Sequence, residues 1–239
     1  MTHPLLDSVI ADRRLRVVAT ERADGDVHPT RVSPLQLRTR QCNVTPPDRL
    51  WSMIDQVHGV DVICVDDRNA ARRASSARHG WTPLAGVGDV IVTQALDAPI
   101  AVWAADCAPL VLAADDGTLV GAHGGWRGLA AGIIGSAVST TTRRGGSIAA
   151  AVLGPVIHPC CYEFGDAELA SIPDAVEGRT SQGRSALDVP ATIAAQLARA
   201  GVVLDVVGPC TGCDERWFSH RVRAEPGRHA VVAMWEAAA

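Results

Sequence analysis

The residues most suited to chemistry are two histidines and one cysteine near the ends of short apolar runs. His58 lies in QVHGVDV, Cys107 in AADCAPLVL and His123 at the end of LVGAH. Two imidazoles and one thiolate form a donor set suited to Zn²⁺. Taken singly, a buried cysteine or a hydrogen-bonded histidine is the more common interpretation of each residue. Because the three are far apart in sequence, only the fold can bring them to one metal ion.

The stretch GAHGGWRG, residues 121–128, combines His123 with a possible anion site. Arg127 follows the histidine by four residues and precedes a predicted helix. A guanidinium group and the free N–H groups of a helix N-terminus together favour a bound anion such as phosphate. The chain has no lysine, which excludes a Schiff-base lysine and a Walker-type phosphate loop. A tight turn carrying a surface arginine is the alternative interpretation.

These residues need a sheet to position them. Short β-branched runs bounded by Gly, Asp or Pro predict strands at 15–20, 62–65, 90–93, 100–105, 110–114 and 119–123. The Asp-Asp-Gly between the last two runs predicts a β-hairpin. The predicted helices span 47–55, 128–144 and 188–201. In the last helix Asp188 is the expected N-cap, Pro190 lies in the first turn and Gly201 follows the end.

Helices and hairpins interleave without a strict βαβ rhythm. This pattern favours an α/β (α+β) fold, with residues 1–239 forming one domain of mixed sheets covered by helices. The polar stretch 66–86 is longer than most connections, and we expect it to be mobile or to lie over a site.

Composition excludes several classes of protein. The chain is 47% hydrophobic and 20% charged with a net charge of -4, which is typical of a globular protein. It lacks an apolar run of the roughly 18 to 20 residues that span a membrane, and its N-terminus does not resemble a secretion signal. We therefore expect a cytoplasmic protein with no membrane partner. Scattered arginines and few Tyr or Phe residues argue against a nucleic-acid partner.

The chain has seven cysteines, and a disulfide framework is not expected in the cytoplasm. Cys210 and Cys213 form a C-x-x-C pair without a second pair, so we expect a structural role. Cys160 and Cys161 are adjacent, a spacing that we do not expect to chelate one metal or to form a disulfide. Cys42 and Cys64 read as small hydrophobic residues.

Five motifs follow one another as in a known family. They are QVHG, GVGDVIVT, ADCAPLVL, GAHGGWRG and LGPVIHPCCYEFG, between Gln56 and Gly165, with a weaker echo at PCTGCDERWFSHR. The chain thereby resembles the YfiH/LACC1 family (DUF152) of zinc purine nucleoside phosphorylases, formerly labelled polyphenol-oxidase laccases. The resemblance implies a layered YfiH-like or CNF1-like sandwich. It also implies one zinc ion on His58, Cys107 and His123, with a fourth position for water or substrate.

The activity implied by the resemblance is the phosphorolysis of adenosine, inosine or guanosine to base and ribose 1-phosphate, together with deamination of adenosine. Arg127 is then the expected holder of phosphate, and Asp106 and Glu163 are acid–base candidates. A C-terminal motif of the family matches Ser219, His220 and Arg221. The match is consistent with residues that line the cleft and equally with the end of a surface strand. The preferred nucleoside, the second substrate and the oligomeric state stay open.

The N-terminal region departs from the family. TERADGDV, residues 20–27, keeps Thr20, Arg22 and Gly25 of the family's TTRxGGVS, and QLRTRQCNV stands where the family has NLG. Substrate preference depends on these segments if they form a wall of the pocket.

Three other functions compete with this one. Cys107 and His123 match a cysteine hydrolase acting on a peptidoglycan-precursor amide, which requires a thiolate free of metal. A copper polyphenol oxidase is disfavoured because the eight histidines include no H-x-H pair, so any copper would be adventitious. The third is a zinc or nucleotide-binding module without turnover.

Overall fold

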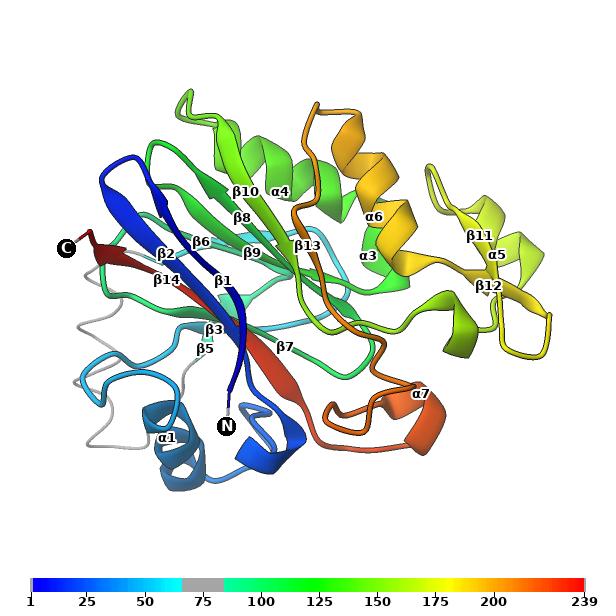
Figure 1. Cartoon of the computed structure of the whole chain (residues 1–239), viewed down its shortest axis with the longest axis horizontal. Coiled ribbons are helices and arrows are strands. Elements are labelled where there is room, and N and C mark those ends of the chain that lie inside the picture. Colours follow the sequence, from blue (N-terminus) through cyan, green and yellow to red (C-terminus); the bar gives the residue numbers. More distant parts are fainter. Residues whose placement is uncertain (1, 66–83, 239) are drawn as a thin grey trace.

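A computed structural model describes residues 2–65 and 84–238, and two stacked sheets dominate it (Figure 1). One sheet is antiparallel, in the order β1 (His3–Ile10), β2 (Arg13–Ala19), β14 (His229–Ala237), β7 (Ile100–Ala104). The second has the order β13 (Val206–Val207), β10 (Ile148–Leu153), β8 (Ala108–Ala114), β9 (Leu119–Gly124), β6 (Val90–Thr93), β4 (Val62–Cys64). It is mixed, because β13 pairs with β10, and β4 with β6, in parallel. The predicted mixed α/β fold is confirmed.

Two short strand pairs and the helices surround the large sheets. The pairs are β3 (Met53–Asp55) with β5 (Leu84–Val87), and β11 (Glu177–Arg179) with β12 (Ser185–Leu187). The helices are α1 (Pro34–Cys42), α3 (Trp126–Ala131), α4 (Ile133–Thr142), α5 (Asp166–Ala170), α6 (Val189–Ala198) and α7 (His220–Arg223), with 3₁₀ turns η1 (Arg22–Asp24) and η2 (Pro159–Cys161). None of the described helices is long and apolar enough to cross a membrane.

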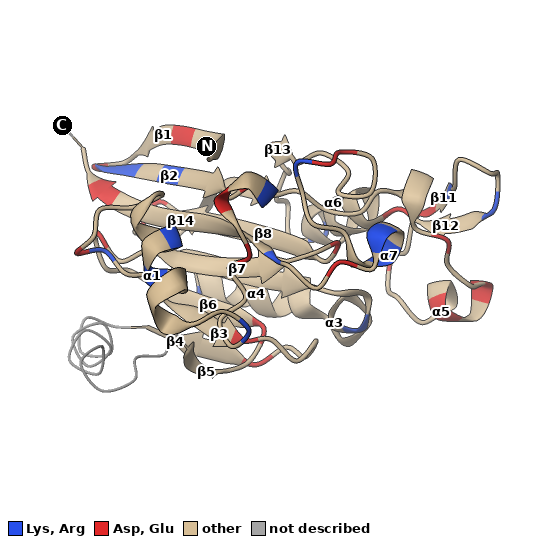
Figure 2. Cartoon of the chain, turned by 90° about the horizontal axis from the view of Figure 1, so that it is seen from below, with Lys and Arg blue, Asp and Glu red and all other residues tan. Residues whose placement is uncertain are grey.

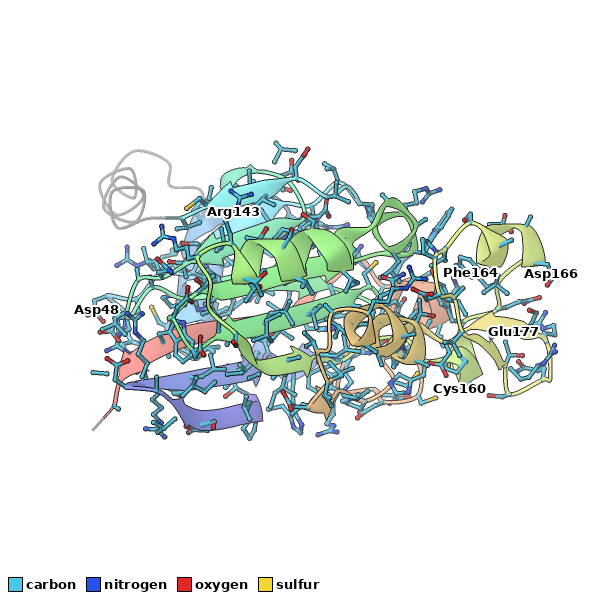
Figure 3. All side chains as sticks on the ribbon, turned by 90° about the horizontal axis from the view of Figure 1, so that it is seen from above. Asp48, Arg143, Cys160, Phe164, Asp166 and Glu177 are labelled. Atoms are coloured by element: carbon cyan, nitrogen blue, oxygen red, sulfur yellow. The ribbon has the colours of Figure 1, made fainter. Side chains whose placement is uncertain are left out.

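Strand β8 shows how the sequence builds the layers. All seven of its residues are buried, and successive side chains enter different cores. Leu110 and Leu112 pack in the core beneath α4 and α6, whereas Val111 and Ala113 pack in the core between the two sheets. This is the period of two that a strand imposes. In Figure 3, α4 and α6 lie across the outer face of the six-stranded sheet.

Most predicted elements are present. All six predicted strands are present, and β8 and β9 form the predicted hairpin. Asp188 caps α6 by accepting the N–H of Ala191, and Gly201 has φ +70° beyond its end. The helix predicted over 128–144 begins at Trp126 and is interrupted at Gly132, whose φ of +91° separates α3 from α4.

The helix predicted over 47–55 is wrong. This segment ends in strand β3, in which Met53 packs beneath the four-stranded sheet and Ile54 packs between the sheets. Successive apolar side chains that pack in two different cores must point to opposite sides of the backbone, as they do in a strand. Tertiary packing therefore overrides the helical pattern. Most of the predicted loop 66–86 lies outside the described residues.

Candidate metal and substrate site

The structure brings the three predicted donor residues together at the end of the central strands β8 and β9 of the six-stranded sheet. His58 lies in the turn after β3, Cys107 directly precedes β8, and His123 lies on β9 opposite Pro109. The Sγ atom of Cys107 is 3.8 Å from Nε2 of His58, and all three donor atoms lie within 4.8 Å of one another. His58 is exposed and His123 is buried, so the group opens to solvent on the His58 side.

Asp89 organises this group from beneath. Its carboxylate is fully buried and lies 2.8 Å from Nδ1 of His123. The same carboxylate accepts the backbone N–H groups of Val57, His58 and Gly59 at 3.2, 3.0 and 2.6 Å. His58 has φ +64°, an uncommon value outside glycine, which these bonds hold in place. Asp89 therefore fixes both histidines, and it directs Nε2 of His123 toward Cys107.

Sequence reasoning did not identify Asp89 as a site residue. It lies in the motif GVGDVIVT at the start of β6, where an aspartate in an apolar run is the available signal. Because a buried carboxylate needs partners, such a residue marks a hydrogen-bond network.

Cys107 and His123 shift each other's pKa. Burial raises the pKa of the Cys107 thiol, but the charge and hydrogen bonds of His123 and His58 outweigh burial and lower it to about 6. Burial lowers the pKa of His123, whereas the Cys107 thiolate and Asp89 raise it to about 9. Without a metal ion, the site therefore favours a thiolate–imidazolium pair between about pH 6 and pH 9.

This pair predicts the reactivity of the metal-free protein. After chelation, alkylation of Cys107 by iodoacetamide is expected to be half-maximal near pH 6, because the lowered pKa keeps the thiolate above that pH. Peptide mass spectrometry across pH 5 to 10 measures this, with exposed Cys64 as the reference thiol. Added zinc should suppress this alkylation of Cys107 and leave that of Cys64 unchanged. A half-maximal pH near the ordinary value of about 8.5 would contradict the thiolate.

The donor set fits a metal ion. Two imidazole nitrogens and a thiolate, with an oriented histidine behind them, suit zinc or another borderline cation. Gly125 lies against this group, because a Cβ atom at that position would clash with Cδ2 of His58 and lie 3.4 Å from Sγ of Cys107. Only glycine therefore leaves the backbone close enough to the donors.

An aromatic cluster carrying two arginines adjoins the metal donors. Phe164 makes ring contacts with Trp126 and Tyr162, with centroids 5.6 and 5.2 Å away. The Arg127 guanidinium lies 4.4 Å from the centre of the Trp126 ring, and that of Arg221 lies 4.6 Å from the centre of the Tyr162 ring. Both arginines are exposed. Figure 2 shows the basic residues of α3 and α7 at the same end of the molecule.

A small cavity joins the two regions. Its volume is about 30 Å³, and Cys107, Asp106, Gly125, Trp126 and Tyr162 are among its lining residues. Burial raises the pKa of Tyr162 to about 12, and the neighbouring thiolate of Cys107 adds to the shift, so the phenol stays protonated. A protonated phenol at this position can donate a hydrogen bond to a ligand.

The two predicted acid–base residues occupy different surroundings. Asp106 is buried, and its carboxylate accepts hydrogen bonds from the Thr211 hydroxyl and the Arg221 backbone N–H, both at 2.6 Å. Glu163 is exposed and pairs with Arg184 at 2.8 Å. The structure thus places Asp106 as an anchor between Cys107 and the C-terminal segment, whereas the carboxylate of Glu163 is free to exchange partners with solvent.

The altered N-terminal segment contacts the C-terminal region. The Arg22 guanidinium pairs with the Glu225 carboxylate, and the Thr20 hydroxyl accepts the N–H of Ala230. The FSHR motif forms the start of α7, where the Ser219 side chain caps the helix. Among the described contacts, Thr20 and Arg22 thus hold β14 and its preceding loop.

Known proteins are similar to this chain in sequence and fold. A family model described as multi-copper polyphenol oxidoreductase laccase matches residues 20–236. A purine nucleoside phosphorylase of Streptomyces coelicolor is 35% identical over 202 residues, covering 82% of this chain and 78% of that protein. The purine nucleoside phosphorylase YlmD of Geobacillus stearothermophilus is 35% identical over 190 residues, covering 73% and 68%.

Solved structures extend the likeness to almost the whole chain. The crystal structure of YlmD from Geobacillus stearothermophilus superposes with a TM-score of 0.77 over 98% of this chain and 99% of that one, at 25% identity. A Neisseria meningitidis protein of the DUF152 family superposes with a TM-score of 0.75 at 24% identity, covering 98% of this chain and 100% of that one.

Proposed function

The chain belongs to the YfiH-like (DUF152) family, whose model is described as multi-copper polyphenol oxidoreductase laccase. From that premise we propose that the chain is a zinc-dependent purine nucleoside phosphorylase. Its proposed substrates are phosphate and adenosine, inosine or guanosine, and its products are the base and ribose 1-phosphate. Hydrolytic deamination of adenosine at the same site is the second proposed activity. The relatives carrying the name purine nucleoside phosphorylase support the first activity.

The observation that carries the proposal is a small cavity lined by Cys107, Trp126 and Tyr162, with the guanidinium groups of two arginines over the two rings. Metal donors, aromatic rings and exposed guanidinium groups lie next to one another. Phosphorolysis of a nucleoside needs a surface for the flat base, a cation for phosphate and an electrophile that activates the substrate. Aromatic faces stack on bases, and guanidinium groups bind phosphate in a bidentate geometry.

Each residue has a specific proposed role. His58, Cys107 and His123 would hold zinc, which supplies Lewis acidity and an open coordination position when bound. Arg127 holds phosphate beside the ribose, and Trp126 keeps that guanidinium over its ring.

Three side chains act around these binding groups. Asp89 orients His123. The Tyr162 phenol is proposed to donate a hydrogen bond to the substrate. Of the two carboxylates, Glu163 is the better proton carrier, because both Asp106 oxygens already accept hydrogen bonds.

Product analysis tests the proposal. Zinc-loaded protein is incubated with adenosine, inosine or guanosine, with and without phosphate, and the products are separated by chromatography. Phosphate-dependent release of base and ribose 1-phosphate is expected, and adenosine is also expected to give inosine without phosphate. Both activities should disappear on chelation and return with zinc. Zinc-loaded protein that forms no product would contradict the proposal. Oxidation of a phenol by copper-loaded protein is the test of the polyphenol oxidase alternative.

Arg127→Ala is expected to raise the KM for phosphate roughly 10- to 100-fold, since a hydrogen bond to a charged group contributes about 1.5–3 kcal/mol. The KM for the nucleoside and the zinc content should change little. Arg143→Ala is the matched control, because this exposed arginine lies at the opposite end of the molecule from Phe164 (Figure 3). Steady-state kinetics with phosphate varied at saturating inosine measures the effect, and an unchanged KM would exclude Arg127 as the phosphate ligand.

A cysteine hydrolase is the second candidate, and one observation favours it. Cys107, His123 and Asp89 line up as nucleophile, base and orienting carboxylate, which is the order of a hydrolytic triad. Chelation distinguishes the two functions. It should abolish phosphorolysis, whereas it should leave or increase thiol-dependent hydrolysis of an amide such as a peptidoglycan-precursor amide.

A further inference from the structure

The structure gathers four cysteines at a second place, apart from the metal donors described above. Cys160 and Cys161 end the η2 turn, and Cys210 and Cys213 lie in the segment before α7. Their four Sγ atoms all lie within 4.8 Å of one another. In Figure 3, Cys160 is at the end of the molecule that carries β11 and β12. Cys160 and Cys210 are 50 positions apart in the sequence, so only the fold brings the two pairs together.

The spacing of the sulfur atoms matches one tetrahedral metal ion. Cys160 Sγ lies 3.8, 3.7 and 3.4 Å from the Sγ atoms of Cys161, Cys210 and Cys213, and Cys161 Sγ lies 3.4 Å from that of Cys213. Four thiolates placed at about 2.3 Å around a zinc ion are about 3.8 Å apart. A disulfide needs about 2.05 Å between sulfurs, and all four thiols are free. A four-iron cluster, with each sulfur on its own iron, needs a wider spacing.

The backbone around Cys210 is arranged to receive a negative sulfur. The N–H of His158 points to Cys210 Sγ at 3.3 Å, and the N–H groups of Gly212 and Cys213 also donate to this atom. Arg223 donates to the carbonyl oxygens of Thr211 and Gly212 at 3.0 and 3.1 Å, which places a guanidinium group beside the turn. Backbone donors and a nearby cation stabilise thiolates, the form that binds metal.

Two adjacent chain segments hold the pairs in register. Val156 forms a parallel bridge to Cys210, through hydrogen bonds of 3.2 Å from Val156 to Pro209 and 3.0 Å from Thr211 to Val156. At Gly212 a Cβ atom would lie 2.8 Å from both Cβ and Sγ of Cys161. Glycine at this position therefore allows the two cysteine turns to approach each other.

We propose that Cys160, Cys161, Cys210 and Cys213 bind a second, structural zinc ion as a closed tetrathiolate site. The sulfur spacing, the backbone donors and the close approach at Gly212 carry this inference, which does not depend on the proposed activity. Four protein ligands leave no open position, as in structural zinc sites. The ion would join the segment before Tyr162 to the segment of Thr211, which hydrogen-bonds Asp106. The ion would therefore help to fix Tyr162 and Asp106, which line the small cavity beside Cys107.

Metal analysis tests the proposal without an activity measurement. In a background of His58→Ala with Cys107→Ser, which removes the first site, purified protein is expected to retain one zinc ion per chain by mass spectrometry of metals. Adding Cys213→Ser should remove that ion, whereas adding Cys64→Ser, at an exposed cysteine outside both groups, should not. Cobalt loaded into the background protein should give intense thiolate-to-metal charge-transfer bands that Cys213→Ser greatly reduces.

A footprinting experiment covers the case in which Cys213→Ser does not fold. In the native wild-type chain, the four cysteines should resist iodoacetamide until a strong chelator is added, whereas Cys64 reacts at once. Any of three results would overturn the proposal. In the first, the background protein contains no metal and its four cysteines react freely with iodoacetamide. In the second, the mass of the protein shows disulfide bonds among these cysteines. In the third, protein expressed with both metals binds stoichiometric iron in place of zinc.

Discussion

His123→Ala is expected to remove one zinc ion per chain and to reduce phosphorolysis at least about 1,000-fold. A bound metal provides several kcal/mol of charge stabilisation in the transition state, and each 1.36 kcal/mol corresponds to a factor of ten in rate. His123 is the most buried of the three donors and the one whose ring Asp89 orients at Nδ1, so its removal leaves only His58 and Cys107 as protein ligands. Metal content and turnover of inosine with saturating phosphate measure the two effects.

The controls separate loss of metal from loss of folding. His123→Gln keeps much of the buried volume and should lose metal and activity while its thermal unfolding stays close to that of the wild type. His3→Ala, on strand β1 of the other sheet, should keep both. A His123→Gln protein that turns over inosine at the wild-type rate would show that the triad is not the catalytic centre. It would direct attention to the thiol of Cys107.

The sequence predicted the parts of the site that carry distinctive side chains. His58, Cys107 and His123 were identified by residue type, and the family resemblance, which the comparisons confirm, agreed with them. The strands that position them were also predictable, because β8 and β9 are short, apolar and bounded by turn residues. The local pattern of apolar and turn residues was sufficient to predict these two strands.

What the sequence did not predict depends on contacts between distant segments. The helix proposed over 47–55 failed because Met53 and Ile54 enter different cores, which no local period reveals. The four-cysteine group was missed for the same reason, since parallel pairing of the segments at Val156 and Cys210 brings the two pairs together. Asp89 was missed because its role is defined by three backbone groups on another loop.

Asp89→Asn is expected to lower the affinity for zinc, and with it activity at limiting zinc, about 10- to 100-fold, which is the usual effect of losing a partner behind a metal ligand. Asparagine keeps the shape but has one acceptor oxygen in place of two. It therefore cannot serve His123 and the N–H groups of His58 and Gly59 together. Competition with a chelator measures the affinity, and excess zinc should restore part of the activity. Asp48→Asn, at an exposed aspartate labelled in Figure 3, is the matched control.

The same variant has a predicted dependence on pH. Burial raises the pKa of Asp89, but hydrogen bonds from His123 and Gly59 outweigh burial and hold this pKa below the ordinary value of 3.8. A carboxyl group whose pKa is lower in the folded state contributes stability above its unfolded pKa, and this contribution is lost as the pH falls through the folded pKa. Metal-free Asp89→Asn should therefore unfold at a lower temperature than wild type at pH 6, with a difference that narrows below pH 4. A constant difference across this range would show that the charge of Asp89 contributes no stability, and that the variant loses only hydrogen bonds that do not depend on ionisation.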